Sequence, residues 1–144
     1  MRMASMALAL SICLVAVPGS AQEARRGILY KDPQCGCCEN YANYLKRNGF
    51  EVQIVQTDDL PSINRQNGVD PSIEGCHTML IDGYVVGGHV PVDVVNGLLA
   101  GRPPIKGISL PGMPQGSPGM GGSKQEPFAI YEVGTMPLKI YVVE

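Results

Sequence analysis

The sequence CGCC at residues 35–38 decides how the rest of the chain is interpreted. The apolar segment before it, GILY at 27–30, predicts a short strand, and KDPQ at 31–34 predicts a turn. From Cys37 onward, aromatic and apolar residues recur at three- and four-residue spacing, which predicts a helix that ends at Gly49. The cysteines would then lie where a loop enters a helix N-terminus, and the helix dipole there favours thiolate over thiol. Such a loop can bind a soft cation or carry out disulfide exchange.

The length and charge of the chain exclude several classes of protein. Its 144 residues are enough for one domain. The formal net charge is −2, and the sequence has no basic stripe and no cationic patch interleaved with aromatic residues. We therefore expect no nucleic-acid partner.

The first 21 residues have the pattern of a secretory signal peptide. Arg2 precedes an apolar run at residues 4–17, and small residues follow at 18–21, so we expect cleavage after Ala21. An uncleaved anchor is the alternative, but it needs about 20 apolar residues and this run is shorter. Cleavage removes one of the 11 basic residues and none of the 13 acidic ones, which gives a net charge of −3. The sequence thus predicts a periplasmic protein with no membrane attachment after cleavage.

The cysteines favour a functional site over a scaffold. Cys13 would leave with the signal peptide, and Ile12 before it is too bulky for a lipoprotein cleavage site. The mature chain would keep Cys35, Cys37, Cys38 and Cys76. Cysteines of exported proteins usually form structural disulfides. Here a bridge within the CGCC loop is expected to be strained, and only Cys76 lies elsewhere.

The remaining pattern alternates strands and helices. Residues 50–55 alternate apolar and polar side chains as a strand does, and Asp82-Gly83 is a hairpin signal between two apolar segments. The expected strands are 27–30, 50–55, 78–81 and 84–86, and the expected helices are 37–48, 58–67 and 92–100. This order, β-α-β-α-β-β-α, is that of an α/β thioredoxin-like fold. The CGCC loop falls where that fold carries its redox loop.

The C-terminal part differs in composition. Residues 101–122 are rich in Gly, Pro, Ser and Met, a composition that is typical of a flexible tail. A Pro-Gly-Met near-repeat there contains Met113 and Met120. Residues 128–133 and 138–143 predict a terminal hairpin. We therefore expect a metal-binding domain at 22–101 and an extension at 102–144 that packs back on it.

The chemistry of the loop favours copper(I). Cys35 and Cys38 have the C-x-x-C spacing of a redox pair, but the additional Cys37 would place three thiolates side by side. A cation that bridges thiolates removes their repulsion. Zinc commonly takes two separated cysteine pairs, to which adjacent cysteines are poorly suited. Copper(I) prefers thiolate and thioether ligands, and contiguous cysteines can share several ions.

Cys76-His77 is the second half of the predicted site. In the thioredoxin order the residues before the third strand face the redox loop, and His77 occupies the place of the usual cis-proline. Cys76 would therefore lie beside the CGCC loop, although a buried, apolar-like cysteine is the alternative. His77 could bind copper, orient a water or satisfy a backbone carbonyl. His89 could complete a ligand set or cap the last helix, and Met113 and Met120 could be thioether ligands or packing residues.

Three segments together resemble the CopG-type periplasmic copper-resistance proteins, a family also catalogued as a metal-binding domain of unknown function. They are YKDPQCGCC at 30–38, GCHTMLIDGYVVGGHVP at 75–91 and LPGMPQGSPGM at 110–120. The resemblance covers residues 27–135. It implies a thioredoxin-like fold, a cysteine-bridged copper(I) cluster and a role in copper tolerance in a Gram-negative envelope. By position, it assigns the four mature cysteines to the cluster and matches His77 and His89 to the family's histidines.

Three functions are compatible with these residues. The first is a periplasmic copper(I)-binding protein for copper homeostasis, with other periplasmic copper-handling proteins as partners. The second is a thiol–disulfide oxidoreductase that uses Cys35 and Cys38. The absence of a proline before Thr78 counts against it, because that proline normally admits a substrate peptide and excludes metal. The third, a disulfide-stapled binding module, would need all four cysteines paired.

Overall fold

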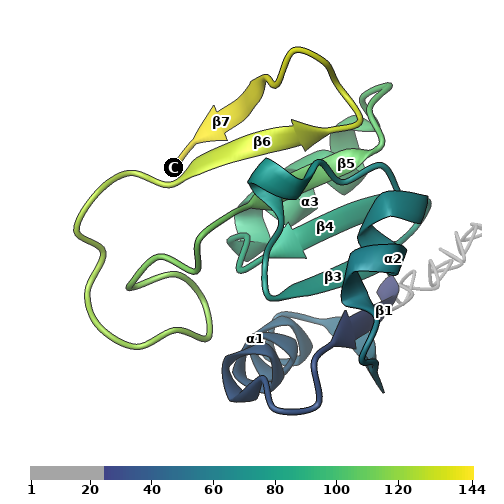
Figure 1. Cartoon of the computed structure of the whole chain (residues 1–144). Helices are drawn as coiled ribbons and strands as arrows, with labels where there is room; N and C mark the ends of the chain where they lie inside the picture. Colours follow the sequence, from purple (N-terminus) through teal and green to yellow (C-terminus); the bar gives the residue numbers. More distant parts are fainter. Residues whose placement is uncertain (1–24) are drawn as a thin grey trace, which may run out of the picture.

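The computed structural model describes residues 25–144, so the predicted signal peptide lies outside the described residues. Seven strands form one sheet in the order β2-β1-β3-β4-β5-β6-β7 (Figure 1). The strands are β1 (Arg25–Lys31), β2 (Phe50–Gln56), β3 (His77–Ile81), β4 (Tyr84–Gly88), β5 (Gly107–Leu110), β6 (Ala129–Val133) and β7 (Ile140–Val143). The helices are α1 (Gly36–Arg47), α2 (Leu60–Gln66), the 3₁₀ helix η1 (Pro71–Ile73) and α3 (Val92–Gly101). The α/β class and the β-α-β-α-β-β-α order that were predicted up to residue 101 are confirmed.

Helix α1 forms because its apolar residues share one face. Its buried residues are Cys38, Tyr41, Ala42 and Leu45, at the i, i+3, i+4 and i+7 positions of a core-facing helix. Gly49 ends this segment with a φ of 86°, a conformation that glycine adopts at little cost. Helix α1 connects β1 to β2, which pair in parallel. The cysteine loop therefore lies between the end of β1 and the start of α1.

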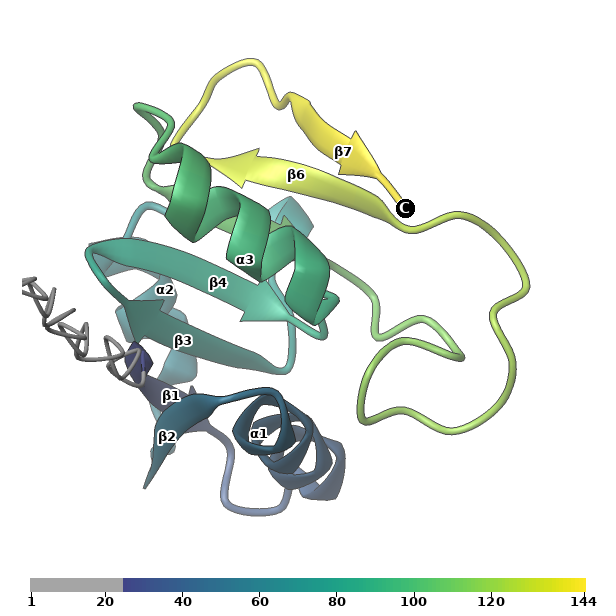
Figure 2. The ribbon, with the colours of Figure 1, turned by 180° about the vertical axis from the view of Figure 1, so that it is seen from behind.

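Two apolar layers enclose the sheet. Helices α1 and α3 pack with one face of the sheet in the larger core, which contains Leu29, Val86 and Ile108. Figure 2 shows α3 in front of the sheet when the molecule is seen from behind. On the opposite face, η1 contributes Ile73 to a smaller core with Val85. The face of β1 and β3 that packs in the larger core is thus buried, whereas Ile28 on the other face of β1 is exposed.

The hairpin between β3 and β4 is confirmed. Asp82 and Gly83 both have positive φ, 50° and 83°, as a two-residue hairpin turn of this kind requires. Strand β4 is longer than predicted, because Gly87 and Gly88 continue it. A Cβ on Gly88 would lie 2.1 Å from the carbonyl oxygen of Leu110. Glycine is therefore required here for β5 to approach β4, directly before His89.

The C-terminal residues extend the same sheet. Residues 107–110, for which the sequence analysis predicts no element, form β5 and pair in parallel with β4. The sequence signal for this strand is weak, because the strand has only four residues and lies inside a Gly- and Pro-rich stretch. The predicted terminal hairpin is confirmed, since β6 and β7 pair antiparallel and β6 also pairs with β5. The proposed division between residues 101 and 102 stays a prediction.

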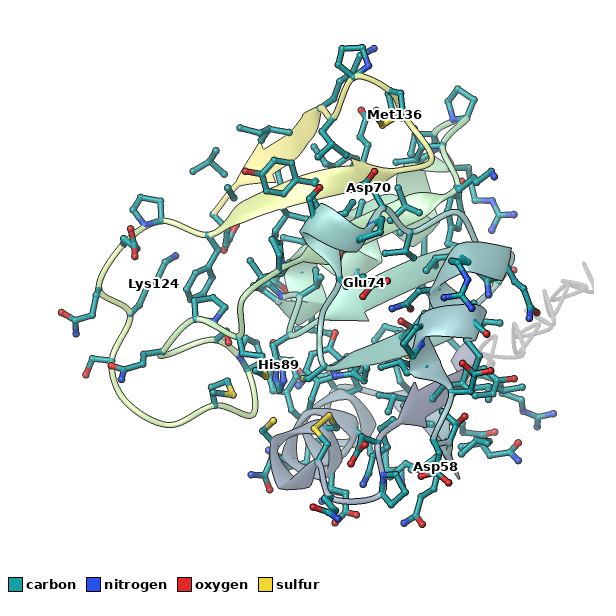
Figure 3. The ribbon with its side chains drawn as sticks, viewed as in Figure 1. Asp58, Asp70, Glu74, His89, Lys124 and Met136 are labelled. Carbon is teal, nitrogen blue, oxygen red and sulfur yellow. A yellow bond between two sulfur atoms is a disulfide. The ribbon has the colours of Figure 1, made fainter. Side chains whose placement is uncertain are left out.

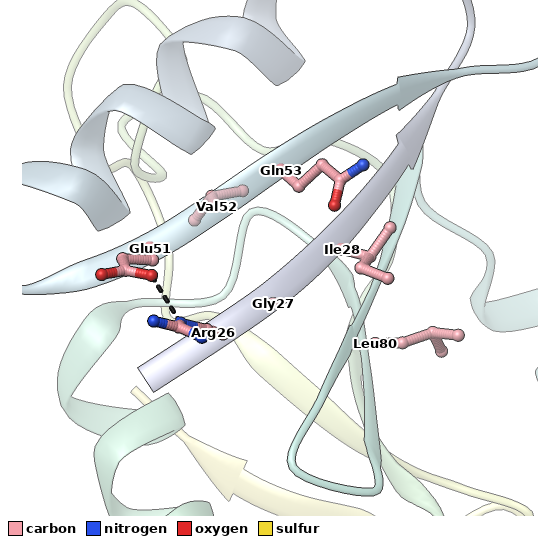
Figure 4. A pocket seen from close by; sticks show the side chains of 7 residues that line it. All are labelled: Arg26, Gly27, Ile28, Glu51, Val52, Gln53 and Leu80. Carbon is pink, nitrogen blue, oxygen red and sulfur yellow. Dashed lines mark hydrogen bonds and ion pairs between the residues drawn. The ribbon is translucent and has the colours of Figure 1, made fainter. Parts of the chain in front are cut away.

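One surface pocket of the described residues is separate from the predicted site. A pocket of about 560 Å³ lies along β1 and β2 and is lined by Arg26, Ile28, Gln53 and Leu80 among others (Figure 4). None of the predicted site residues lines it. Within residues 25–144, no helix is long and apolar enough to cross a membrane.

We predict that Ile108→Ala destabilises the protein by about 2 to 5 kcal/mol, because Ile108 is fully buried and its truncation leaves a cavity. Urea unfolding with the cysteine pair kept in one redox state measures the loss. Ile140→Ala in the edge strand β7, where the side chain is 54% exposed, is the matched control and should cost about 0.5 kcal/mol or less. Equal losses would mean that β5 is not part of the cooperative core.

Candidate metal centre

The fold brings all four predicted cysteines together. Cys35 is the N-cap of α1, Cys37 and Cys38 lie in its first turn, and Cys76 directly precedes β3. The Sγ atoms of Cys35 and Cys37 are 3.4 Å apart, and Cys76 Sγ lies 3.5 Å from Cys38 Sγ and 4.0 Å from Cys37 Sγ. All four sulfur atoms lie within 4.8 Å of one another. The prediction that Cys76 lies beside the CGCC loop is therefore confirmed.

Two of these cysteines are oxidised in the structure. Cys35 and Cys38 form a disulfide, while Cys37 and Cys76 are free thiols. The sequence analysis argues against a bridge within the loop, whereas the structure forms one between Cys35 and Cys38. Positions i and i+3 at the start of a helix are neighbours, and their Cα atoms are 5.5 Å apart, as is usual for disulfides.

Both histidines lie against Cys76. His89 Nε2 is 3.1 Å from Cys76 Sγ, and His77 Nδ1 is 3.6 Å from it. His89 Nδ1 lies 2.6 Å from the carbonyl oxygen of Pro118, which can only accept, so Nδ1 carries the proton. His89 Nε2 therefore presents its lone pair to the sulfur. Figure 3 shows His89 between α1 and the C-terminal loop.

Burial keeps these imidazoles neutral. Burial first, and His89 second, lower the pKa of His77 to about 3, while the backbone of Gly88 acts in the opposite direction. Burial also lowers the pKa of His89, against the opposing effect of its bond to Pro118. Neutral imidazole is the form that binds a metal. The Nε2 atom of His77 is buried without a hydrogen-bond partner, which is uncommon for a buried polar atom.

Cys76 is a thiol in the metal-free protein. Burial first, and the neighbouring Cys37 second, raise its pKa to about 12. A thiolate-binding metal would therefore have to displace the Cys76 proton. Cys76 lies outside helix α1 in sequence, although its sulfur lies against cysteines of the first turn of that helix.

Tyr41 on helix α1 forms a wall of the site. It is fully buried, and its ring stacks on His77 at a centroid distance of 4.7 Å and meets the edge of His89 at 5.3 Å. Its hydroxyl donates a hydrogen bond of 2.9 Å to the carbonyl oxygen of Val90. Tyr41 therefore fixes the planes of both imidazoles. The spacing of aromatic residues in α1 indicates a side chain that faces the core, but it does not indicate the contact of Tyr41 with the two histidines.

The Pro-Gly-Met segment reaches the site through its backbone. Besides the Pro118 contact to His89, Asn40 donates to the carbonyl oxygen of Gly119, and a Cβ on Gly119 would lie 2.6 Å from the backbone nitrogen of Tyr41. Met120 is half-buried, whereas Met113 is 41% exposed and has a φ of 47°. The binding of metal by either thioether stays a prediction.

Four sulfur atoms and two neutral imidazoles define a soft donor set in an α/β fold. This is the chemistry of a thiolate metal centre or of a disulfide redox site.

The comparisons agree with this class. A family model described as "Protein of unknown function, DUF411" matches residues 73–120. Two solved structures, titled "Copper resistance protein copG- Form 2" and "Form 1", are 32% identical to the chain, with TM-scores of 0.78 and 0.77. The alignments cover 85% of this chain and 99% and 98% of those chains. The chain therefore belongs to the CopG family of copper resistance proteins. No curated protein sequence matches it.

We predict that the metal-free, oxidised protein loses stability as the pH falls from about 6.5 toward 3. The folded state keeps His77 neutral down to about pH 3, whereas the unfolded chain binds a proton near pH 6.5, so the unfolded state takes up more protons in this window. Urea unfolding at pH 7 and pH 5 should give a larger loss for the wild type than for His77→Gln. Equal losses in the two proteins would show that His77 is not held neutral.

Proposed function

We propose that the protein is a periplasmic copper(I)-binding protein for copper resistance that holds more than one ion in a cysteine-bridged site. The observation that carries the proposal is the convergence of Cys35, Cys37, Cys38 and Cys76 with His77 and His89. These residues form two overlapping groups, one of four cysteines and one of Cys76 with the two histidines. Relatives titled copper resistance proteins support copper as the metal.

The donor set fits copper(I) better than zinc. Copper(I) is a soft cation that prefers thiolate, and it also accepts imidazole. Six donors exceed what a single copper(I) ion uses, and neighbouring sulfur atoms at 3.4 to 4.0 Å can bridge ions. Cys76 belongs to both groups of donors, so we assign it the bridging position. Met113 and Met120 remain candidate thioether ligands.

Binding by all four cysteines requires reduction of the disulfide. An external dithiol that is itself oxidised to a disulfide supplies the two electrons and two protons that convert the Cys35–Cys38 bridge into two thiols, and copper(I) then displaces thiol protons. The two histidines need no proton loss, because both are held neutral by burial. The site is therefore proposed to be redox-active, with copper binding favoured in the reduced form. Storage of copper, its transfer to other periplasmic copper-handling proteins and a change of its oxidation state are all compatible with this.

Location in the periplasm is part of the proposal. It is supported by the signal-peptide pattern at residues 1–21, with expected cleavage after Ala21. In that compartment copper(I) and thiols both meet oxidants, which favours a protected site.

We predict that the reduced mature protein, prepared anaerobically, binds two or more copper(I) ions per chain and that its four thiols become protected together. Cys76→Ser should lower the stoichiometry below that of the wild type, because it removes the donor shared by the two groups. Copper per chain, measured by competition with a copper(I) chelator and with thiols counted in the same sample, checks this.

Met136→Leu is the matched control for handling and stability. Met136 is 73% exposed and lies at the β6–β7 turn, away from His89 (Figure 3). Its substitution should leave the stoichiometry unchanged. One weakly held ion in the wild type, or full loading of the Cys76→Ser variant, would contradict the proposal.

The second candidate function is thiol–disulfide exchange, and the observed Cys35–Cys38 disulfide favours it. In this function the reduced pair would pass two electrons to a substrate disulfide and become oxidised itself. His77 counts against it, because this histidine fills the place of the cis-proline that contacts substrate peptides in thioredoxin-like folds. Among residues 25–144, only the Met136–Pro137 bond is cis.

We predict that the metal-free, reduced protein reduces insulin only slowly, and that copper(I) loading suppresses even this activity because it occupies the same sulfur atoms. Turbidity of insulin with and without copper, with Cys35→Ser as the inactive control, measures both effects. Rapid reduction of insulin together with a lack of copper binding would favour the oxidoreductase.

A further inference from the structure

A fully buried lysine lies at the base of the cysteine loop. Lys31 is the last residue of β1, and its side chain is 0% exposed. It is the only lysine or arginine in the buried class among residues 25–144. A buried charge is costly unless it is paired, so its partners indicate what it does.

The Lys31 ammonium group has three donors and three oxygen partners. Its Nζ atom lies 3.2 Å from the carbonyl oxygen of Asp32, 3.3 Å from that of Pro33 and 3.2 Å from Oε1 of Glu39. The carbonyl of Asp32 also accepts the backbone N–H of Cys35 at 3.0 Å. Lys31 is therefore bonded to the turn that sets the position of the first cysteine.

These contacts hold the loop on both sides. Asp32 and Pro33 precede the cysteines in sequence, and Glu39 directly follows Cys38 on helix α1. Lys31 is also the register partner of His77 across the β1–β3 ladder. One side chain thus connects the chain before the cysteines with the chain after them, beside the strand that carries the first histidine.

We infer that Lys31 is a positioning residue, which holds the CGCC loop in the geometry that binds copper(I) and closes the Cys35–Cys38 disulfide. The copper part of this inference rests on the proposed function. Outer contacts of this kind orient metal ligands, and their loss typically lowers metal affinity by about 10- to 100-fold. Lys31 acts through the backbone and Glu39 and touches no donor atom itself.

Stability alone does not require a lysine at this position. Replacing a buried ion pair by a well-packed apolar side chain is often neutral or stabilising. Methionine has nearly the length of lysine and could fill the same space on the inner face of β1. A lysine whose three donors all serve the loop is instead explained by the geometry of the cysteines.

Lys31→Met tests the inference, with Lys46→Met on the exposed surface of helix α1 as the control. Copper(I) affinity is measured by competition with a chelator. In metal-free protein, the equilibrium of the Cys35–Cys38 pair with glutathione is measured by trapping the thiols. Lys31→Met should bind copper(I) about 10- to 100-fold more weakly. Its pair should shift toward the dithiol on the order of tenfold, because a loosened loop brings the two sulfur atoms together less often.

Lys46→Met should match the wild type in both measurements. If the wild type binds no copper(I), the proposed function fails, and the glutathione equilibrium alone decides the role of Lys31. Wild-type values for Lys31→Met in both measurements would overturn the inference. Should Lys31→Met not fold, Glu39→Gln decides instead: its side chain is 54% exposed, and it should shift both values in the same direction by a smaller factor. An unchanged Glu39→Gln protein would then overturn the inference.

Discussion

The antiparallel pairing of β1 with β3 is the constraint on which the site depends. In this register Lys31 lies opposite His77, so the end of β1 and the beginning of β3 meet at the same edge of the sheet. The CGCC loop leaves β1 at that edge, and Cys76 enters β3 there. Because side chains alternate between the faces of a strand, a slip of one residue would move His77 to the opposite face. The meeting of four cysteines is thus a consequence of strand register, not of contacts between the cysteines themselves.

The site places polar donor atoms in apolar surroundings, and burial shifts the pKa of its histidine and cysteine donors in opposite directions. Burial lowers the pKa of His77 and raises that of Cys76, so both residues are neutral before a metal binds. Tyr41 supplies much of this apolar setting, since its ring contacts both imidazoles while its hydroxyl is satisfied by Val90. The disulfide and the protonated Cys76 form a donor set in which three of the four sulfur atoms are uncharged, and this set avoids repulsion between thiolates until a cation arrives. It also makes metal binding depend on the release of thiol protons.

Local sequence patterns were sufficient for most of the fold and for the identity of the cysteine cluster. The periodicity of α1, the Asp82-Gly83 turn and the terminal hairpin are short-range signals, and they correspond to the observed elements. The sequence analysis misses strand β5 because its four residues, which begin with a glycine and precede a proline, are too few to show a period. Pairing with β4 and β6 makes this segment a strand. The contact of Pro118 with His89 and the burial of Lys31 depend on residues brought together by the sheet. No local sequence pattern predicts either of these two features.

The connection between β5 and β6 illustrates how the C-terminal segment serves the site. These strands are antiparallel neighbours, with Ser109 opposite Tyr131, so a short hairpin could join them. The chain instead uses residues 111–128, and a long loop costs more conformational entropy to close than a short one. Hydrogen bonds within the loop, such as that from the backbone N–H of Gly116 to the carbonyl of Gly121, offset part of that cost. The contacts of Pro118 with His89 and of Gly119 with α1, in the middle of the loop, offset more of it. The length of this loop is therefore explained by its contacts with the histidine and with α1, because pairing of the two strands does not require it.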